Sequence, residues 1–171
     1  MKVLAISCHP DDVEVNCAGT LAKYAKQGHS VTICHVANGN MGHVIIPPEE
    51  LRNIRRQEAA EAGKLIGARV LSCDIGDVVV YNQSKEQRDL VIDILREVKP
   101  DVIITHSPDD YMPDHVAVSK LVFDASFVAS IPHYNDKGLG VSDIVPIYYM
   151  DTLAGINCIP TEYVDITDTL E

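Results

Sequence analysis

Short nonpolar runs alternate with segments of helical spacing along almost the whole chain, and this pattern restricts the fold more than any other feature of the sequence. The nonpolar, strand-like runs are Lys2–Cys8, Val31–Ala37, Val70–Cys73, Val102–Thr105, Pro146–Met150 and Tyr163–Ile166. The predicted helices are Glu14–Gln27, Glu49–Ile66, Ser84–Val98 and His115–Ala129. Because strands separated by helices usually pair in parallel, with the helices packed on the sheet, the pattern predicts an α/β fold.

Length and charge narrow this prediction. A chain of 171 residues suits one domain. We therefore predict a single Rossmann-like domain over residues 1–171, with a mostly parallel sheet and helices on both faces. Lys and Arg total 14 while Asp and Glu total 25, which gives a formal charge of −11. A negative chain disfavours nucleic acids and anionic membranes as partners, because their phosphates attract basic surfaces.

Two further features indicate a cytoplasmic protein. The opening residues, MKVLAISCHPDD, hold a nonpolar run too short for a signal peptide, and no stretch approaches the ~18 nonpolar residues of a membrane span. The five cysteines are irregularly spaced, and Cys8, Cys34 and Cys73 lie in or beside strand-like runs, as is typical of reduced core thiols. Cys8 is also a candidate metal ligand beside His9, although its place at a strand end favours core packing.

Polar residues gather in the segments that follow the first and fourth predicted strands. The first segment reads HPDDVE over residues 9–14, and the second reads HSPDDYMPDH over residues 106–115. In a doubly wound sheet these two strands can be neighbours, with ligands bound at their carboxyl ends. If they are neighbours, His9, Asp12 and His115 can converge on one ion. Two imidazoles and a carboxylate with one open position form a catalytic zinc set.

Asp11 has a different expected role. A single turn points His9 and Asp12 the same way, whereas the adjacent Asp11 cannot easily bind the ion from the same turn. A metal lowers the pKa of its bound water toward ~7, so Asp11 can then act as a general base. A simpler interpretation also stays open: Asp11 with Glu14, and Asp114 at the start of the last predicted helix, resemble helix caps.

The two polar segments resemble the LmbE-like (PIG-L) family of zinc-dependent N-acetylglucosamine deacetylases. The resemblance rests on HPDDVE after the first strand and on Pro-Asp-His opening a later helix. It extends to IRRQEA over residues 54–59 and to the stretch Tyr148–Asp165, and so to almost the whole chain. It implies one LmbE-like deacetylase domain, Zn²⁺ as cofactor and a small N-acetyl sugar conjugate as partner. Relatives in this family are often homo-oligomers.

The resemblance also implies roles for individual residues. The positions that match the zinc ligands are His9, Asp12 and His115. Asp11 matches the general base, and Asp114 matches a carboxylate that orients a catalytic histidine in relatives. Arg55 and Asn38 match positions that face the substrate pocket. On their own, Arg55 would indicate a solvated helix charge and Asn38 a loop-forming residue.

Two departures from the family pattern matter. Many relatives have a histidine where this chain has Met112, and that histidine is thought to protonate the leaving amine or stabilise the oxyanion. A thioether can do neither, so either Asp11 carries the proton both ways, or another group such as His106 substitutes, or turnover is weak. Relatives also usually continue beyond the segment that resembles Tyr163–Glu171. This chain is therefore either a short member or one that lacks the family's C-terminal segment.

Several functions remain open at this point. The favoured one is zinc-dependent hydrolysis of an acetamide, with Arg55 helping to hold the oxyanion. The alternative, motivated by Met112, is a metal- and sugar-binding domain with weak or no turnover. Two histidines and a carboxylate also serve non-haem iron oxygenases, but normally on a jelly roll. A nucleotide-binding role is disfavoured, because no Gly-x-Gly-x-x-Gly follows the first strand.

Overall fold

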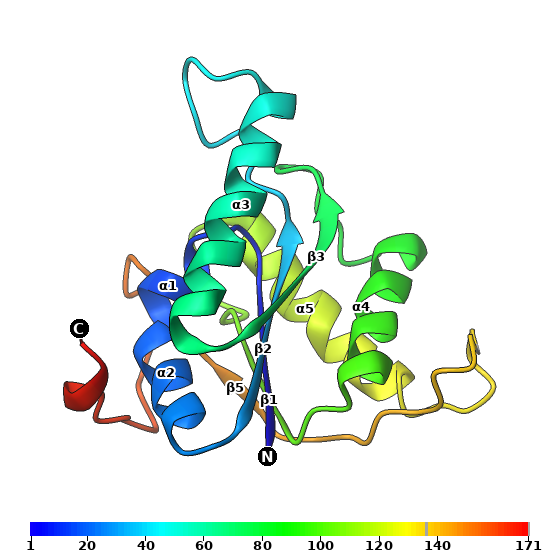
Figure 1. The fold of residues 1–171 in the computed structure, drawn as a ribbon. Helices are drawn as coiled ribbons and strands as arrows, with labels where there is room; N and C mark the ends of the chain where they lie inside the picture. The colour runs from blue at the N-terminus through cyan, green and yellow to red at the C-terminus, as the bar shows by residue number, and fades with distance from the viewer. Residues whose placement is uncertain (136, 171) are drawn as a thin grey trace.

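A central sheet of five parallel strands runs through the computed structural model, which describes residues 1–135 and 137–170 (Figure 1). The strands are β1 (Lys2–Ser7), β2 (Ser30–Ala37), β3 (Arg69–Ile75), β4 (Val102–Thr105) and β5 (Ile147–Tyr149). Their spatial order is β3-β2-β1-β4-β5, and every pairing in the described sheet is parallel. The predicted α/β fold is confirmed, and β1 does lie beside β4.

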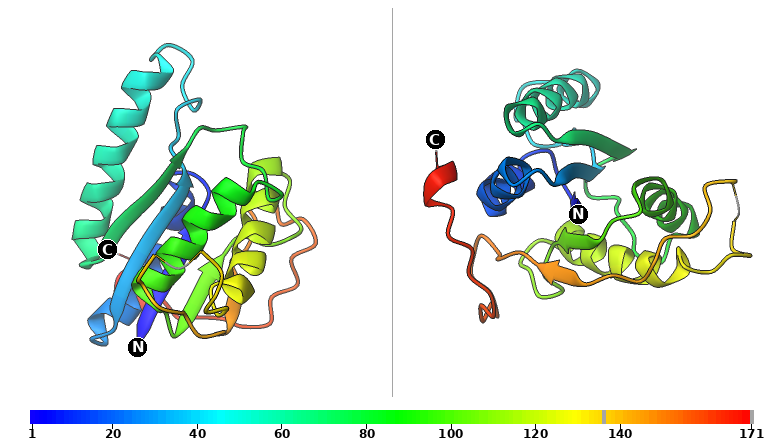
Figure 2. Two further views of the ribbon diagram at one scale, coloured as in Figure 1. Left: turned by 90° about the vertical axis from the view of Figure 1, so that its right-hand side faces the viewer. Right: turned by 60° about the horizontal axis from the view of Figure 1, so that its bottom comes forward.

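Helices cover both faces of the sheet (Figure 2). They are α1 (Asp12–Asn16), α2 (Ala18–Lys26), α3 (Pro48–Ile66), α4 (Lys85–Val98) and α5 (Pro113–Val128), followed by the short 3₁₀ helix η1 (Thr167–Thr169). Alternate side chains of β1 enter different cores. Val3 and Ala5 pack with residues of α1 and α2, whereas Leu4 and Ile6 pack with residues of α4 and α5. Burial on both faces explains why β1 is a continuous nonpolar run.

The arrangement of β1 and β4 creates a crevice at their carboxyl ends. The chain leaves β1 for α1 on one face of the sheet and leaves β4 for α5 on the other face. This is the topological switch point of a doubly wound sheet, where ligands usually bind. Both polar segments of the sequence therefore begin at the carboxyl ends of two adjacent strands.

Three details differ from the sequence pattern. The predicted helix over residues 14–27 is two helices, because Cys17, with φ −147° and ψ 7°, interrupts the helical backbone. Helix α5 begins at Pro113, which is suited to a first helical position that needs no amide donor. The run 163–166 forms no strand. Ile166 instead lies against Gly19, whose carbonyl also accepts a hydrogen bond from Thr169.

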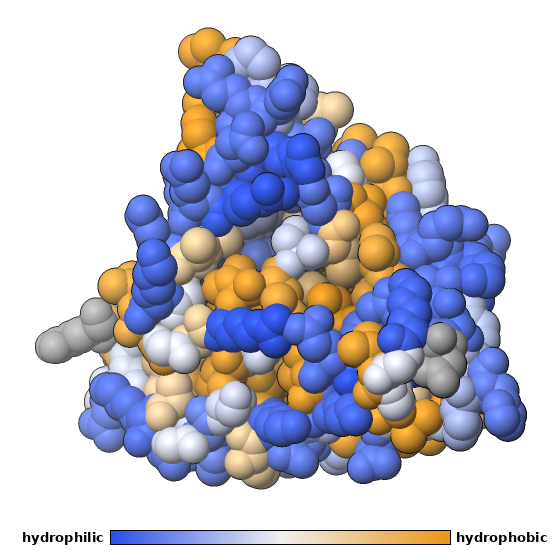
Figure 3. Space-filling model, turned by 45° about the vertical axis from the view of Figure 1, so that its right-hand side comes forward, coloured by the Kyte–Doolittle hydropathy of each residue, from blue (hydrophilic) through white to orange (hydrophobic). Residues whose placement is uncertain are grey.

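The surface combines hydrophobic and hydrophilic regions. On the face shown in Figure 3, hydrophobic residues gather in the middle and hydrophilic residues surround them. The edge strand β3 is only partly buried, although Leu71 and Ile75 pack against the core. No helix in the described part of the chain is both long enough and apolar enough to cross a membrane.

Candidate metal centre and active site

A tight turn after β1 fixes His9 and Asp12 together. The His9 carbonyl accepts hydrogen bonds from the amides of Asp11 and Asp12, at 3.0 and 3.3 Å. The Oδ2 atom of Asp12 accepts one in return from the His9 amide, at 2.6 Å. Asp11 occupies the N-cap position of α1 but makes no side-chain capping bond. Its carboxylate lines a pocket instead, so the capping interpretation of Asp11 is not supported.

The segment after β4 brings His115 to the same place. His115 is buried in the first turn of α5. Its Nδ1 atom lies 3.2 Å from Oδ2 of Asp110, whose Oδ1 accepts a hydrogen bond from the Met112 amide at 3.0 Å. The ring of His106 stacks on the His115 ring, with centroids 3.9 Å apart. These contacts fix the orientation of the His115 ring and leave its Nε2 atom facing Asp12.

His9, Asp12 and His115 offer ligand atoms that all lie within 4.8 Å of one another. Nε2 of His115 is 3.2 Å from Oδ1 of Asp12, and Nδ1 of His9 is 3.6 Å from Oδ2 of Asp12. Within the described residues, Nε2 of His115 is buried and has no hydrogen-bond partner, since the approach to Asp12 lacks hydrogen-bonding geometry. An unpaired buried nitrogen is costly unless something else binds it.

This donor set fits a divalent metal ion. Two imidazole nitrogens and one carboxylate are the ligands of catalytic zinc sites, which keep a further position for water or substrate. The contact of Asp110 with the second ring nitrogen of His115 is the usual support for such a ligand, because it holds the tautomer and the ring plane. A bound ion would also satisfy the unpaired Nε2 atom.

The electrostatics of the site favour a cation. Burial raises the pKa of Asp12, but contacts with His106, His115 and His9 outweigh it and hold that pKa well below its ordinary value. Burial lowers the pKa of His9, yet the hydrogen bond and charge of Asp12 raise it overall. For Asp11, burial and then the negative charge of Asp12 raise the pKa. The centre therefore holds an excess of negative charge that a metal ion would balance.

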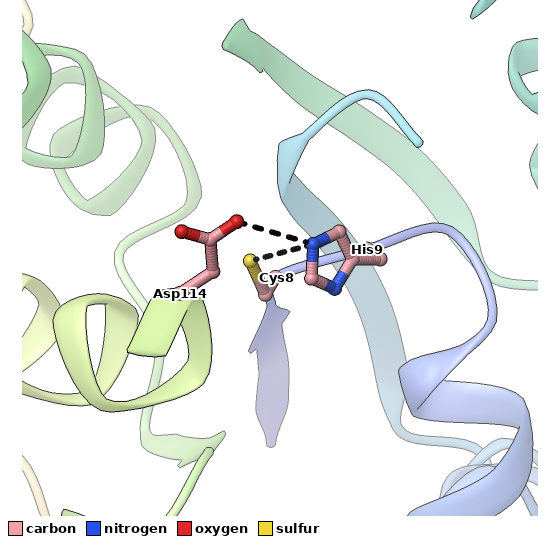
Figure 4. Close-up of side chains that lie close together, drawn as sticks. All are labelled: Cys8, His9 and Asp114. Carbon is pink, nitrogen blue, oxygen red and sulfur yellow. Dashed lines mark hydrogen bonds and ion pairs between the residues drawn. The ribbon is translucent and has the colours of Figure 1, made fainter. Parts of the chain in front are cut away.

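His9 is held from its other side by Asp114 and Cys8 (Figure 4). Its Nε2 atom lies 3.5 Å from Oδ2 of Asp114 and 3.5 Å from Sγ of Cys8. The same Asp114 oxygen accepts a hydrogen bond from the Val78 amide at 2.7 Å, and α5 has no side-chain cap at Met112. Asp114 thus supports His9 and does not cap its helix. Burial raises the pKa of Cys8, which keeps it a thiol.

A pocket of about 690 Å³ opens above these residues. Its lining includes His9, Asp11, Asp12, Asp77, Asp114, His115 and Arg55. Asn38 is absent from this lining among the described residues. Its Nδ2 atom donates to the side chain and the carbonyl of Asp74, at 3.2 and 3.4 Å, and its Oδ1 atom accepts from the Asn40 amide. Asn38 therefore shapes the loop behind the pocket, and its contact with substrate stays a prediction.

Two carboxylates in this region were missed by the sequence analysis. Asp77 is buried and accepts hydrogen bonds from the amides of Gly39 and Met41, at 2.8 and 2.9 Å, so it joins the loops after β2 and β3. Asp110 orients His115. Asp77 follows a predicted strand, as the other site residues do, and that position was an available signal. The role of Asp110 depends on side-chain direction, which spacing alone does not give.

His106, named above as a substitute for the missing histidine at Met112, lies below the centre. Its Nε2 atom accepts a hydrogen bond from the Cys8 amide at 2.9 Å and lies 3.1 Å from Oδ2 of Asp12. Its side chain is 1% exposed, and it is not among the described residues that line the pocket. This buried position gives His106 no direct route to a bound substrate.

A family model named PIG-L, GlcNAc-PI de-N-acetylase, matches residues 4–126, which is more than half of the chain. The chain belongs to this LmbE-like (PIG-L) family, as the two motifs predicted. Solved structures of relatives have the same overall fold.

Relatives with different activities resemble the chain closely. The structure of 4-carboxy-2-hydroxymuconate hydratase from Pseudomonas putida KT2440 has a TM-score of 0.89 at 25% identity and covers 99% of this chain and 74% of that one. N,N'-diacetylchitobiose deacetylase from Pyrococcus horikoshii has a TM-score of 0.84 at 28% identity, covering 98% of this chain and 64% of that one. A 1D-myo-inositol 2-acetamido-2-deoxy-alpha-D-glucopyranoside deacetylase of Nocardioides sp. is 26% identical over 86% of this chain and 61% of its own length. The chain spans about half to two thirds of the length of the curated relatives it matches.

Proposed function

We propose that this chain is a zinc-dependent hydrolase that removes the acetyl group from an N-acetylated amino sugar, giving acetate and the free amine. The observation that carries the proposal is that ligand atoms of His9, Asp12 and His115 lie close together, with Asp11 beside them in the pocket. One of these atoms, Nε2 of His115, is buried without a hydrogen bond. Family membership supports it, as do two relatives whose names state the deacetylation of acetamido sugars or of diacetylchitobiose.

The residues of the centre have different proposed roles. His9, Asp12 and His115 would hold the ion, and zinc, when bound, would supply the positive charge that polarises the amide carbonyl and acidifies water. Asp11 takes the proton from the water that attacks the carbonyl carbon. Arg55 stabilises the negative charge that develops on the carbonyl oxygen, since it lines the same pocket.

Asp11 also resolves the problem posed by Met112. When the bond between carbon and nitrogen breaks, the leaving nitrogen needs a proton, and a thioether has none to give. His106 is held below the centre by Cys8 and Asp12, away from the pocket. We therefore assign both proton transfers to Asp11, which takes the proton from water and then passes it to the amine.

The test is acetate release from N-acetylglucosamine conjugates, with and without a chelator, using Asp11→Asn as the key variant. We expect release that stops on chelation and falls by orders of magnitude in Asp11→Asn, while the zinc content of that variant is retained. Asp109→Asn is the matched control, because Asp109 is exposed and lies outside the pocket lining. Sugar binding without acetate release would instead favour the metal- and sugar-binding domain.

A second candidate is the addition of water to a carbon–carbon double bond. It is favoured by the high structural similarity to the hydratase and by Met112, which removes a family proton donor for amide cleavage. Hydration of 4-oxalmesaconate, the substrate named for a curated hydratase relative from the same Pseudomonas putida strain, shortens a conjugated system. Loss of ultraviolet absorbance with this compound, together with no acetate release from sugars, would favour the hydratase.

Three wider expectations remain predictions. One is that residues 1–171 form one LmbE-like deacetylase domain. Another is a cytoplasmic location, supported by five free cysteines. The third, a homo-oligomer, is checked by sedimentation velocity.

A further inference from the structure

A second group of metal-ligand side chains lies beside His9. Sγ of Cys8, a ring nitrogen of His9 and a carboxylate oxygen of Asp114 all lie within 4.8 Å of one another. Figure 4 shows the sulfur and the carboxylate facing the same ring nitrogen, Nε2. The other ring nitrogen, Nδ1, faces Asp12 in the candidate catalytic set. The two nitrogens of His9 therefore point to two different groups of ligands.

The distances in this second group match those between ligands of a tetrahedral zinc ion. Nε2 of His9 lies 3.5 Å from Sγ of Cys8 and 3.5 Å from Oδ2 of Asp114. Zinc bonds of about 2.3 Å to sulfur and about 2.1 Å to nitrogen or oxygen, at tetrahedral angles, place sulfur and nitrogen about 3.6 Å apart and nitrogen and oxygen about 3.4 Å apart. The nitrogen–oxygen separation is also longer than the ~2.7–3.2 Å of a well-formed hydrogen bond. An ion of this size therefore fits with little side-chain movement.

Contacts outside the group hold its members in place. The Val78 amide donates to Oδ2 of Asp114 at 2.7 Å. The Cys8 amide donates to His106, and the Cys8 carbonyl accepts a hydrogen bond from the Ala37 amide at 2.8 Å. Val78 has a φ of 60°, which is strained for a β-branched residue, and its side chain is 69% exposed, so burial does not compensate for the strain. Such strain is typical of a segment that positions a functional group, which here is the carboxylate of Asp114.

The group is buried and yet borders the pocket. Cys8 and Asp114 are buried, while His9 and Asp114 are among the residues that line the pocket, so an ion has a path of entry. The negative charges of Asp12 and Asp77 act on the sulfur and favour a cation beside it. Core packing explains the burial of Cys8, but it does not explain why a ring nitrogen and a carboxylate lie at its sulfur.

We propose that Cys8, His9 and Asp114 form a second metal site, selective for zinc and similar thiophilic ions, beside the candidate catalytic site. A thiolate prefers such ions to Mg²⁺ and Mn²⁺, which favour oxygen ligands. Metal binding releases the proton of the Cys8 thiol to solvent. A neutral imidazole has one free lone pair, so His9 cannot bind two ions at once. An ion held through Nε2 therefore removes His9 from the ligands of the catalytic ion.

The test is a titration of the metal-free protein with Co²⁺, because a bond between thiolate and cobalt absorbs in the near ultraviolet. We expect this band in the wild type and its loss in Cys8→Ala. Asp114→Asn should weaken the cobalt affinity read from the band by about 100-fold or more, since even the loss of a group that supports a ligand costs about 10–100-fold. Cys34→Ala is the matched control and should keep the band, because Cys34 is equally buried but lies outside the group. An excess of Mg²⁺ should not remove the band.

His115→Ala separates the two metal sites. This variant lacks a ligand of the candidate catalytic ion but should keep the thiolate band. Loss of the band in folded His115→Ala would make Cys8 a fourth ligand of the catalytic ion, and the inference would be wrong. The absence of a band in the wild type, or an unchanged band in Cys8→Ala, would also overturn it. If Cys8→Ala does not fold, Asp114→Asn and His115→Ala decide the question.

The shared histidine predicts inhibition by excess zinc, and this consequence rests on the proposed function. Acetate release by the wild type should fall severalfold from its maximum in a large excess of zinc. Asp114→Asn should lose a smaller fraction of its own maximum, because its second site is weaker. Full wild-type activity in excess zinc, with the cobalt band present, would overturn the competition for His9. If no condition gives acetate, the proposed function fails, and the cobalt band alone decides the inference.

Discussion

Two buried polar clusters in this molecule are built in opposite ways. Arg96 is 2% exposed, and its guanidinium donates to four backbone carbonyls at the end of α5 and in the following loop: Ala129, Ile131, Tyr134 and Asn135. The cluster of His9, Asp12 and His115 leaves the Nε2 atom of His115 without a hydrogen bond. The full satisfaction of Arg96 indicates a structural role, whereas an open Nε2 atom beside two other possible metal ligands indicates a binding role, since a buried polar group is costly unless it is partnered.

The largest expected effect is at Asp11, which lies in the pocket beside the unsatisfied cluster. Asp11→Asn removes the proposed base but keeps the size of the side chain, so kcat should fall about 10²–10⁴-fold. Thermal unfolding should change little, because Asp11 makes no capping bond. A steady-state acetate assay and a melting curve on the same preparation check both parts. A variant that lost stability but kept its turnover would place Asp11 with the structural groups.

The opposite outcome is expected at Arg96. Arg96→Met removes four hydrogen bonds from a charged donor, although the carbonyls of Ala129 and Ile131 each keep a backbone donor, so the free energy of unfolding should drop by roughly 3–5 kcal/mol. Activity per folded molecule should stay the same, because Arg96 lies outside the pocket lining. Urea unfolding measures the change. Arg96→Lys keeps the charge but loses the planar fork, so its stability should lie between that of the wild type and that of Arg96→Met.

A third test uses the pH dependence of stability that the buried side chain of His35 creates. It is buried beneath the site with its Nδ1 atom 2.9 Å from Oγ of Ser7, and burial lowers its pKa to about 4. Because this value lies below the unfolded value of about 6.5, the unfolded chain binds the proton first as the pH falls. The stability from neutral His35 is complete above pH ~6.5 and is lost toward pH ~4, amounting to about 2.5 kcal/mol at pH ~4.5. His35→Gln should therefore lose less stability than the wild type between pH 7 and 4.5 in urea titrations; parallel losses would contradict this.

The smallest effect is expected at Asp110, which orients His115 without touching the pocket. Asp110→Asn keeps the shape but removes the charge near Nδ1, so zinc affinity should decrease about 10–100-fold. Competition with a fluorescent chelator measures it. Asp109→Asn is again the control, since Asp109 is exposed. An unchanged affinity would mean that Asp110 serves the turn at Met112 and not the metal ligand.

Parts of the fold followed from local pattern, and other parts did not. The nonpolar run over residues 2–8 is a strand buried on both faces, as its continuity predicted. Four predicted helices were found close to their expected ranges, except that Cys17 divides the first into α1 and α2. The break is not visible in the periodicity, because Leu21 continues the same nonpolar stripe into the same core.

The candidate site was likewise predictable only in part. The motifs named His9, Asp12 and His115, and the structure brings these three together. The place of Asp77 after a predicted strand was a signal, but its hydrogen bond to the loop after β2 was not predictable from spacing. The contact of Asp110 with His115 depends on side-chain direction, which spacing does not give either. The nonpolar lining at the mouth of the pocket could not be predicted either, since its residues come from five separate segments and share no motif.

The sequence by itself determined the α/β class, the family and the candidate ligand residues, because periodicity and short motifs are local properties of a chain. Only the tertiary structure decided that β1 lies beside β4, that Asp114 supports His9 and that Val78 faces the pocket in a strained conformation. These features depend on strand order and on packing between segments far apart in the sequence. Such contacts form only when burial of the whole core compensates for the entropy of closing the long loops between them.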